Sequence, residues 1–242
     1  MIKWTKRHIN GTSAVPHRFL VDTTTYETLD AECHFKYIDD FIELPAALAT
    51  TNHLNAYWSA GARVATGTST ITAGTNGLLV MSTVGHTAND AAELVWPGAD
   101  WHTNSGLVME ARLQIPTVGV AEPDIEMGFR ASANEYALIR VAVAGSVATA
   151  TLNTNKAAAG NVAATGSQIL TAATYYVLRL EVSKTRTCRF YCNNALIATT
   201  GDAVITLGAT AVPMLYVADV TAHVGIQTLS IDAVRIFALD RA

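Results

Sequence analysis

Strong charge and long apolar runs are both missing from this sequence of 242 residues. Charged residues make up only 15% of the chain, and the formal net charge of −4 excludes bulk binding to nucleic acid. Half of the residues are hydrophobic, yet no uninterrupted apolar run reaches the roughly 18 residues that a membrane helix needs. The N-terminal stretch MIKWTKRHINGTSAVPHRF lacks the apolar segment of a signal peptide. We therefore expect no membrane partner, and assembly in a cytoplasm.

Cysteine is scarce, and its spacing does not form a disulfide framework. The three cysteines are Cys33, Cys188 and Cys192. Cys188 and Cys192 have the same parity on one predicted strand, so they cannot easily bond to each other. We expect small buried thiols.

Signatures of nucleotide and metal chemistry are also missing. The sequence contains neither a GxxxxGK[ST] loop nor a GxGxxG turn after a strand. Its seven histidines form no HxxxH or HxH pair and no Ser-His-Asp constellation. We expect no cofactor.

An antiparallel meander stands out in residues 175–200, YYVLRLEVSKTRTCRFYCNNALIATT. Three runs with alternating apolar residues are separated by two polar turns, at Ser183–Arg186 and at Asn193–Asn194. Adjacent asparagines tolerate the positive φ of a two-residue type I′ turn. The pattern predicts three hairpin-connected strands with one buried face.

Further strand patterns recur through most of the chain, and hardly any 3.6-residue stripe is present. This spacing predicts an all-β, two-sheet antiparallel jelly-roll sandwich. We interpret Lys156–Gly166, the segment of lowest complexity, as an exposed loop. The expected strands are Leu78–Thr83, Ala91–Trp96, Gly106–Ile115, Asp124–Ala131, Glu135–Val143, Val147–Asn153, Tyr175–Val182, Met214–Val220 and Thr228–Ala238.

The N-terminal 38 residues differ from the rest, with isolated aromatic residues and no clear periodicity. The first 20 residues contain four basic residues and no acidic one, so the remaining residues carry a formal charge of −8. We predict an extended arm over residues 1–38 ahead of one domain over residues 39–242. A basic arm suits docking onto an acidic surface, and an ordinary solvated terminus is the alternative. The candidate contact residues are Trp4, Lys6, Arg7, Arg18 and Phe19.

The order of the strand sequences carries a family resemblance. From residue 39 to about 239, DDF, NGLLVMST, HTANDAAELVWP, GLVMEARLQI, IEMGFRAS, RFYCNNALIATT and LSIDAVRIFA resemble one whole concanavalin A-like domain. More narrowly, Asn76-Gly77 followed by Asn89-Asp90 and the strand around Glu110 resemble jelly rolls of tailed-phage virion proteins. Met109 departs from that pattern because an aromatic residue is usual at its position.

This resemblance implies a non-enzymatic capsid decoration, cement or head-fibre protein of a bacteriophage virion, assembled in the host cytoplasm. The implied partners are the major capsid protein or another virion protein, and further copies of this chain in a homotrimer.

Two other functions remain open from the residues. Glu122, Asp124 and Glu126 have the E-x-D-x-E spacing of retaining β-glucanases with this fold, and they would share one strand face. Pro123 counts against that interpretation because it cannot donate to a strand ladder. Trp96 and Trp101 flank a short loop, where an exposed pair could stack on a surface glycan; burial under the loop is the alternative.

Calcium is a further alternative that the residues leave open. Oxygen donors lie near the expected strand ends, as several lectins of this fold would require. They form no dense D-x-D-x-N run, and turn capping explains them equally well, so we expect no metal site. The donors are Asp39, Asp40, Asn89, Asp90, Asp100 and Asp219.

Overall fold

The structure is a computed structural model. It describes residues 35–39, 58–60, 70–73, 78–83, 91–96, 101–115, 123–144, 147–156, 160–161, 164–200, 205–206, 210–219 and 227–238. Residues 32–242 form one unit. No helix among these residues is long and apolar enough to span a membrane.

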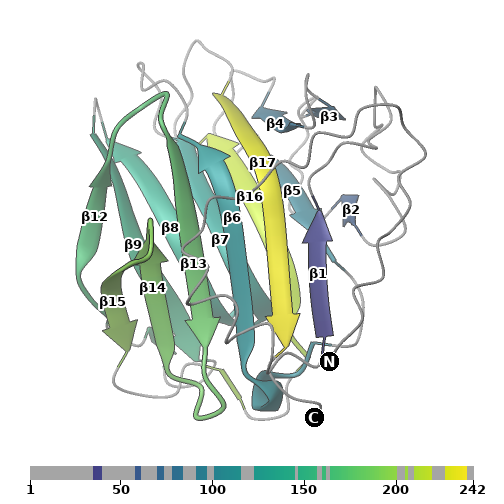
Figure 1. The fold of residues 1–242 in the computed structure, drawn as a ribbon, viewed down its shortest axis with the longest axis vertical. Coiled ribbons are helices and arrows are strands. Elements are labelled where there is room, and N and C mark those ends of the chain that lie inside the picture. The colour runs from purple at the N-terminus through teal and green to yellow at the C-terminus, as the bar shows by residue number, and fades with distance from the viewer. Residues whose placement is uncertain are drawn as a thin grey trace, which may run out of the picture. The chain divides into compact units, whose positions relative to one another are not determined.

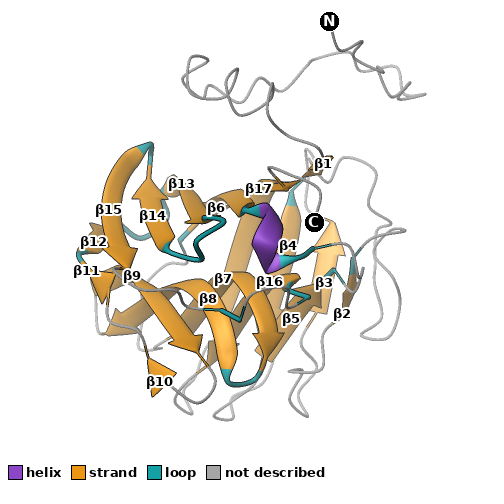
Figure 2. Ribbon diagram, turned by 90° about the horizontal axis from the view of Figure 1, so that it is seen from below, coloured by secondary structure: helices purple, strands orange, loops and turns teal. Residues whose placement is uncertain are grey.

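Two antiparallel sheets lie face to face (Figures 1 and 2). The nine-stranded sheet has the order β11 (Ala164–Thr165), β15 (Ala195–Thr200), β14 (Cys188–Cys192), β13 (Tyr175–Val182), β6 (Leu107–Gln114), β17 (Gln227–Ala238), β4 (Leu79–Thr83) and β3 (Thr70–Ala73), and β1 (Phe35–Asp39) also pairs with β17. The eight-stranded sheet has the order β10 (Gly160–Asn161), β9 (Val147–Lys156), β8 (Glu135–Ala144), β7 (Pro123–Ser132), β16 (Val212–Asp219), β5 (Ala91–Val95) and β2 (Ser59–Ala60), and β12 (Ser167–Leu170) also pairs with β9. A short 3-10 helix, η1 (Thr103–Ser105), precedes β6. The predicted all-β sandwich is confirmed.

Alternating residues of both sheets build the core between them. On β6, Met109 and Leu113 are completely buried, as are Met127 and Phe129 on β7 of the facing sheet. Successive residues of a strand point to opposite faces, so the residues between these face away from the core. The polar residues that alternate with apolar ones along the strands therefore lie on the two outer faces.

The predicted meander is confirmed in its turns. Asn193 and Asn194 both have positive φ angles, 47° and 68°, as a type I′ hairpin requires. The preceding turn ends at Arg186, also with positive φ, 65°. The thiols of Cys188 and Cys192 are free and buried on the core face of β14, and burial raises the pKa of both, that of Cys192 to about 11. These two cysteines are thus the inert core residues that the sequence predicts.

The predicted boundary after residue 38 falls inside a strand. β1 pairs antiparallel with β17, from Phe35 opposite Ala238 to Asp39 opposite Val234. The last four residues of the predicted arm therefore belong to the nine-stranded sheet, because their main chain completes one side of β17. The remaining residues of that arm lie outside the described residues.

The predicted loop Lys156–Gly166 contains two short paired segments, so that interpretation was partly wrong. β10 folds back and pairs antiparallel with the end of β9, and β11 pairs with the end of β15. Gly166 then carries the chain from one sheet to the other with a φ of 104°. A Cβ atom at this position would lie 2.1 Å from the carbonyl oxygen of Ile197, so only glycine fits the crossing.

Candidate functional site

A row of polar side chains crosses the outer face of the eight-stranded sheet. Direct cross-strand partners point to the same face, and the neighbours of Glu126 along β7, Ile125 and Met127, are buried in the core. The row therefore faces away from the core. We call it the polar row; its members, in register across β5, β16, β7, β8 and β9, are Glu93, Tyr216, Glu126, Arg140 and Thr151.

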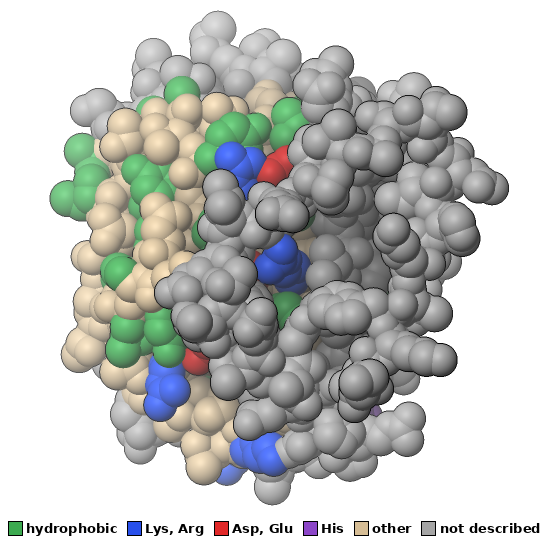
Figure 3. All heavy atoms as spheres, in the orientation of Figure 1, with side chains coloured by type: hydrophobic (Ala, Val, Ile, Leu, Met, Phe, Trp, Pro, Cys, Tyr) green, Lys and Arg blue, Asp and Glu red, His purple; other side chains and the backbone are tan. Residues whose placement is uncertain are grey.

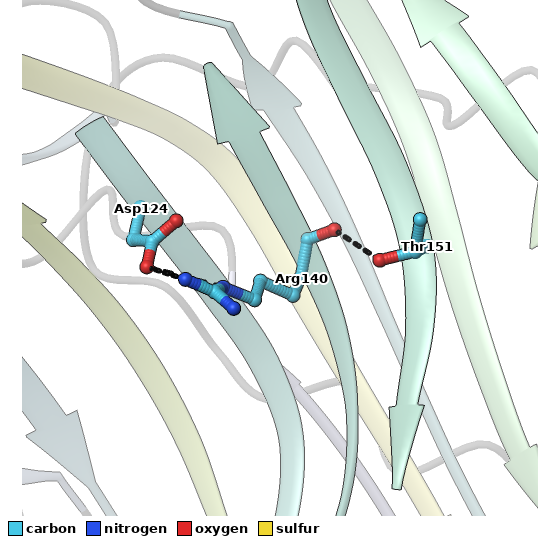
Figure 4. A network of polar contacts seen from close by, with 3 residues as sticks. All are labelled: Asp124, Arg140 and Thr151. Carbon is cyan, nitrogen blue, oxygen red and sulfur yellow. Dashed lines mark hydrogen bonds and ion pairs between the residues drawn. The ribbon is translucent and has the colours of Figure 1, made fainter. Parts of the chain in front are cut away.

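An ion pair occupies the middle of this face (Figure 4). The Nε of Arg140 donates to Oδ2 of Asp124 at 3.1 Å, and Nη2 of the same guanidinium donates to the same oxygen. Only 14% of the Asp124 side chain is exposed, against 40% for Arg140. The hydrogen bond that Arg140 donates to Asp124 raises the pKa of Arg140 further, so the guanidinium stays charged. Thr151 donates to the backbone oxygen of Arg140 at 3.4 Å.

A second carboxylate on this face is also held by arginine. Glu93 is 0% exposed, and its Oε1 lies 2.9 Å from Nη2 of Arg130 on β7. An ionised carboxylate is stable at such a depth only when it is paired and hydrogen-bonded. Glu93 and Arg130 therefore act together as a structural pair.

The structure describes two of the three acidic residues of the E-x-D-x-E motif. Glu122 lies outside the described residues. Asp124 and Glu126 share the outer face of β7, as the two-residue spacing predicts. Asp124, the central residue, is neutralised by Arg140. β7 begins at Pro123 itself. The sequence predicts a start at Asp124, because proline has no N–H to donate to a strand ladder.

The predicted glycan-binding tryptophans are core residues. Trp96 is 5% exposed and Trp101 is 1% exposed. Their rings pack edge to face with centroids 5.4 Å apart, and Trp96 packs in the same way on Trp58 at 5.9 Å. Buried faces cannot stack on a sugar, so the structure corrects this hypothesis: the three indoles form an aromatic core cluster.

The structure does not describe most of the other residues for which a contact or a metal-ligand role was considered. The proposed arm contacts Trp4, Lys6, Arg7, Arg18 and Phe19 all lie outside the described residues. So do Asp40, Asn89, Asp90 and Asp100 among the oxygen donors, and only the backbone of Asp39 and Asp219 is described. Within the part of the chain that is described, no three His, Cys, Asp or Glu side chains converge as metal ligands.

The outer face of the nine-stranded sheet holds a buried charge cluster that the sequence does not predict. Glu110 on β6 lies opposite Arg179 on β13 and Arg235 on β17. Glu110 is 0% exposed and Arg179 is 4% exposed. Loss of hydration raises the pKa of Glu110 to about 7, although both arginines act to lower it.

The charged residues of these pairs can be recognised in the sequence, although their partners cannot. Glu93, Arg140 and Glu110 each interrupt an otherwise apolar strand, as in AAELV, YALIRVAV and LVMEARL. A charged residue within an apolar strand requires a partner of opposite charge on another strand of the same sheet. The identity of that partner depends on strand order, which the sequence alone does not establish.

Comparison with known proteins supports the fold. No protein family and no curated protein matches the sequence. A protein of unknown function from Shewanella oneidensis MR-1 has a similar structure, with a TM-score of 0.61 and 16% identity over 92% of this chain and 98% of that one. LamAcat from Zobellia galactanivorans is also similar, with a TM-score of 0.58 and 14% identity over 83% and 96% of the two chains. The carbohydrate recognition domain of Emp47p matches with a TM-score of 0.56 and 12% identity over 81% and 94%.

These likenesses show the concanavalin A-like β-sandwich fold. The proteins with similar structures include a carbohydrate recognition domain and a putative β-glucanase, and at these identities function does not follow from fold.

Proposed function

We propose that this chain is a non-enzymatic structural protein of a tailed-phage virion, a capsid decoration, cement or head-fibre protein. The observation that supports a non-enzymatic role is the ion pair between Asp124 and Arg140, which occupies the centre of the possible catalytic motif. A retaining glycosidase needs two working carboxyl groups about 5–5.5 Å apart. Here the central motif residue, Asp124, is paired with Arg140, and Glu93 on the same face is paired with Arg130.

The virion role rests on the resemblance of residues 76–112 to phage jelly rolls. In this proposal the arm residues Trp4, Lys6, Arg7, Arg18 and Phe19 attach the protein to the major capsid protein or another virion protein. The sandwich is then displayed on the shell, in a homotrimer assembled in the host cytoplasm. A basic arm attached to an acidic body suits such a division of roles.

Deletion of residues 1–34 tests the attachment, because it leaves β1 in place. We expect the shortened protein to stay folded and to lose co-sedimentation with shells of the same phage. The double variant Lys6→Glu/Arg7→Glu should weaken binding in the full chain at least tenfold. Lys184→Glu on the β13–β14 turn is the matched control and should bind normally. Full binding after removal of the arm would refute the attachment.

Carbohydrate binding is the second candidate, favoured by the polar row on the sheet's outer face. Arg140, with 40% of its side chain exposed, and Thr151 can offer hydrogen bonds to hydroxyl groups. The carbohydrate recognition domain among the similar structures adds a reason to test it.

A glycan panel separates binding from catalysis. Arg140→Ala should remove any sugar binding, whereas Arg189→Ala, on an exposed residue of β14, should not. A blank panel would eliminate this candidate. Release of reducing ends that Glu126→Gln abolishes would instead support a glycoside hydrolase and contradict the first proposal.

A further inference from the structure

We draw no further inference here: the strongest candidate, the buried cluster of Glu110, Arg179 and Arg235 on the outer face of the nine-stranded sheet (the side from which Figure 3 views the molecule), belongs to the charge cluster already described, and with Glu110 at 0% exposure it offers a ligand no access from solvent.

Discussion

Trp101→Ala should lower the free energy of unfolding by about 3–5 kcal/mol, the usual loss for a fully buried tryptophan. Trp101 is 1% exposed, its ring packs on Trp96, and its carbonyl oxygen accepts a hydrogen bond from Ala211 N at 2.7 Å. Truncation removes the ring contacts and leaves a cavity between the sheets. Chemical denaturation measures the loss. For a domain of this size, 3–5 kcal/mol corresponds to a fall in Tm of about 10 °C.

Two controls separate a core role from a ligand-stacking role. Trp101→Phe keeps an aromatic ring and should lose less stability than the alanine variant. Leu196→Ala, at a side chain that is 55% exposed, should change stability by less than about 0.5 kcal/mol. An unchanged unfolding free energy in Trp101→Ala, together with lost sugar binding, would contradict the buried aromatic cluster and restore the stacking hypothesis.

The two-sheet architecture could be predicted because its evidence is local. Alternation in residues 106–115 and 175–182 places every second side chain in the core, and Asn193-Asn194 specifies the turn by its positive φ angles. Each signal needs only neighbours in the sequence. The β9–β10 and β11–β15 contacts were missed because strands of two residues are too short to show alternation.

Burial of the tryptophans was harder to predict. Trp96 and Trp101 flank a Pro97-Gly98 pair, which indicates a loop, and a loop usually lies at the surface. The deciding contact is with Trp58, 38 residues earlier than Trp96 in the sequence. Only the tertiary fold brings these rings together, so sequence alone left exposure and burial as alternatives.

The sequence does not predict which charged residues pair on the outer faces of the two sheets. Asp124 and Arg140 are on neighbouring strands, but Glu93 and Arg130 are on strands that β16 separates, and β16 follows β7 by about 80 residues. The pairing depends on the jelly-roll strand order and not on sequence distance. Once the order is known, an interrupting charge in an apolar strand predicts where its partner must be.

The buried Glu110 should make stability depend on pH in an unusual direction. Its pKa is about 7 in the folded protein, against 4.5 for an ordinary glutamate. Between these values the folded state binds more protons than the unfolded state, so unfolding releases a proton. Stability contributed by this group is complete below pH 4.5 and is lost as pH rises to about 7. One proton corresponds to about 1.4 kcal/mol per pH unit.

Glu110→Gln should remove this dependence because the amide does not titrate. Urea unfolding from pH 4.5 to 8 should therefore show the wild type losing up to about 3 kcal/mol relative to the variant. Glu181→Gln on the same face, with 21% of its side chain exposed, is the control and should keep the wild-type slope. Parallel pH profiles for the wild type and Glu110→Gln would show that Glu110 is ionised across this range, with the two arginines outweighing its loss of hydration.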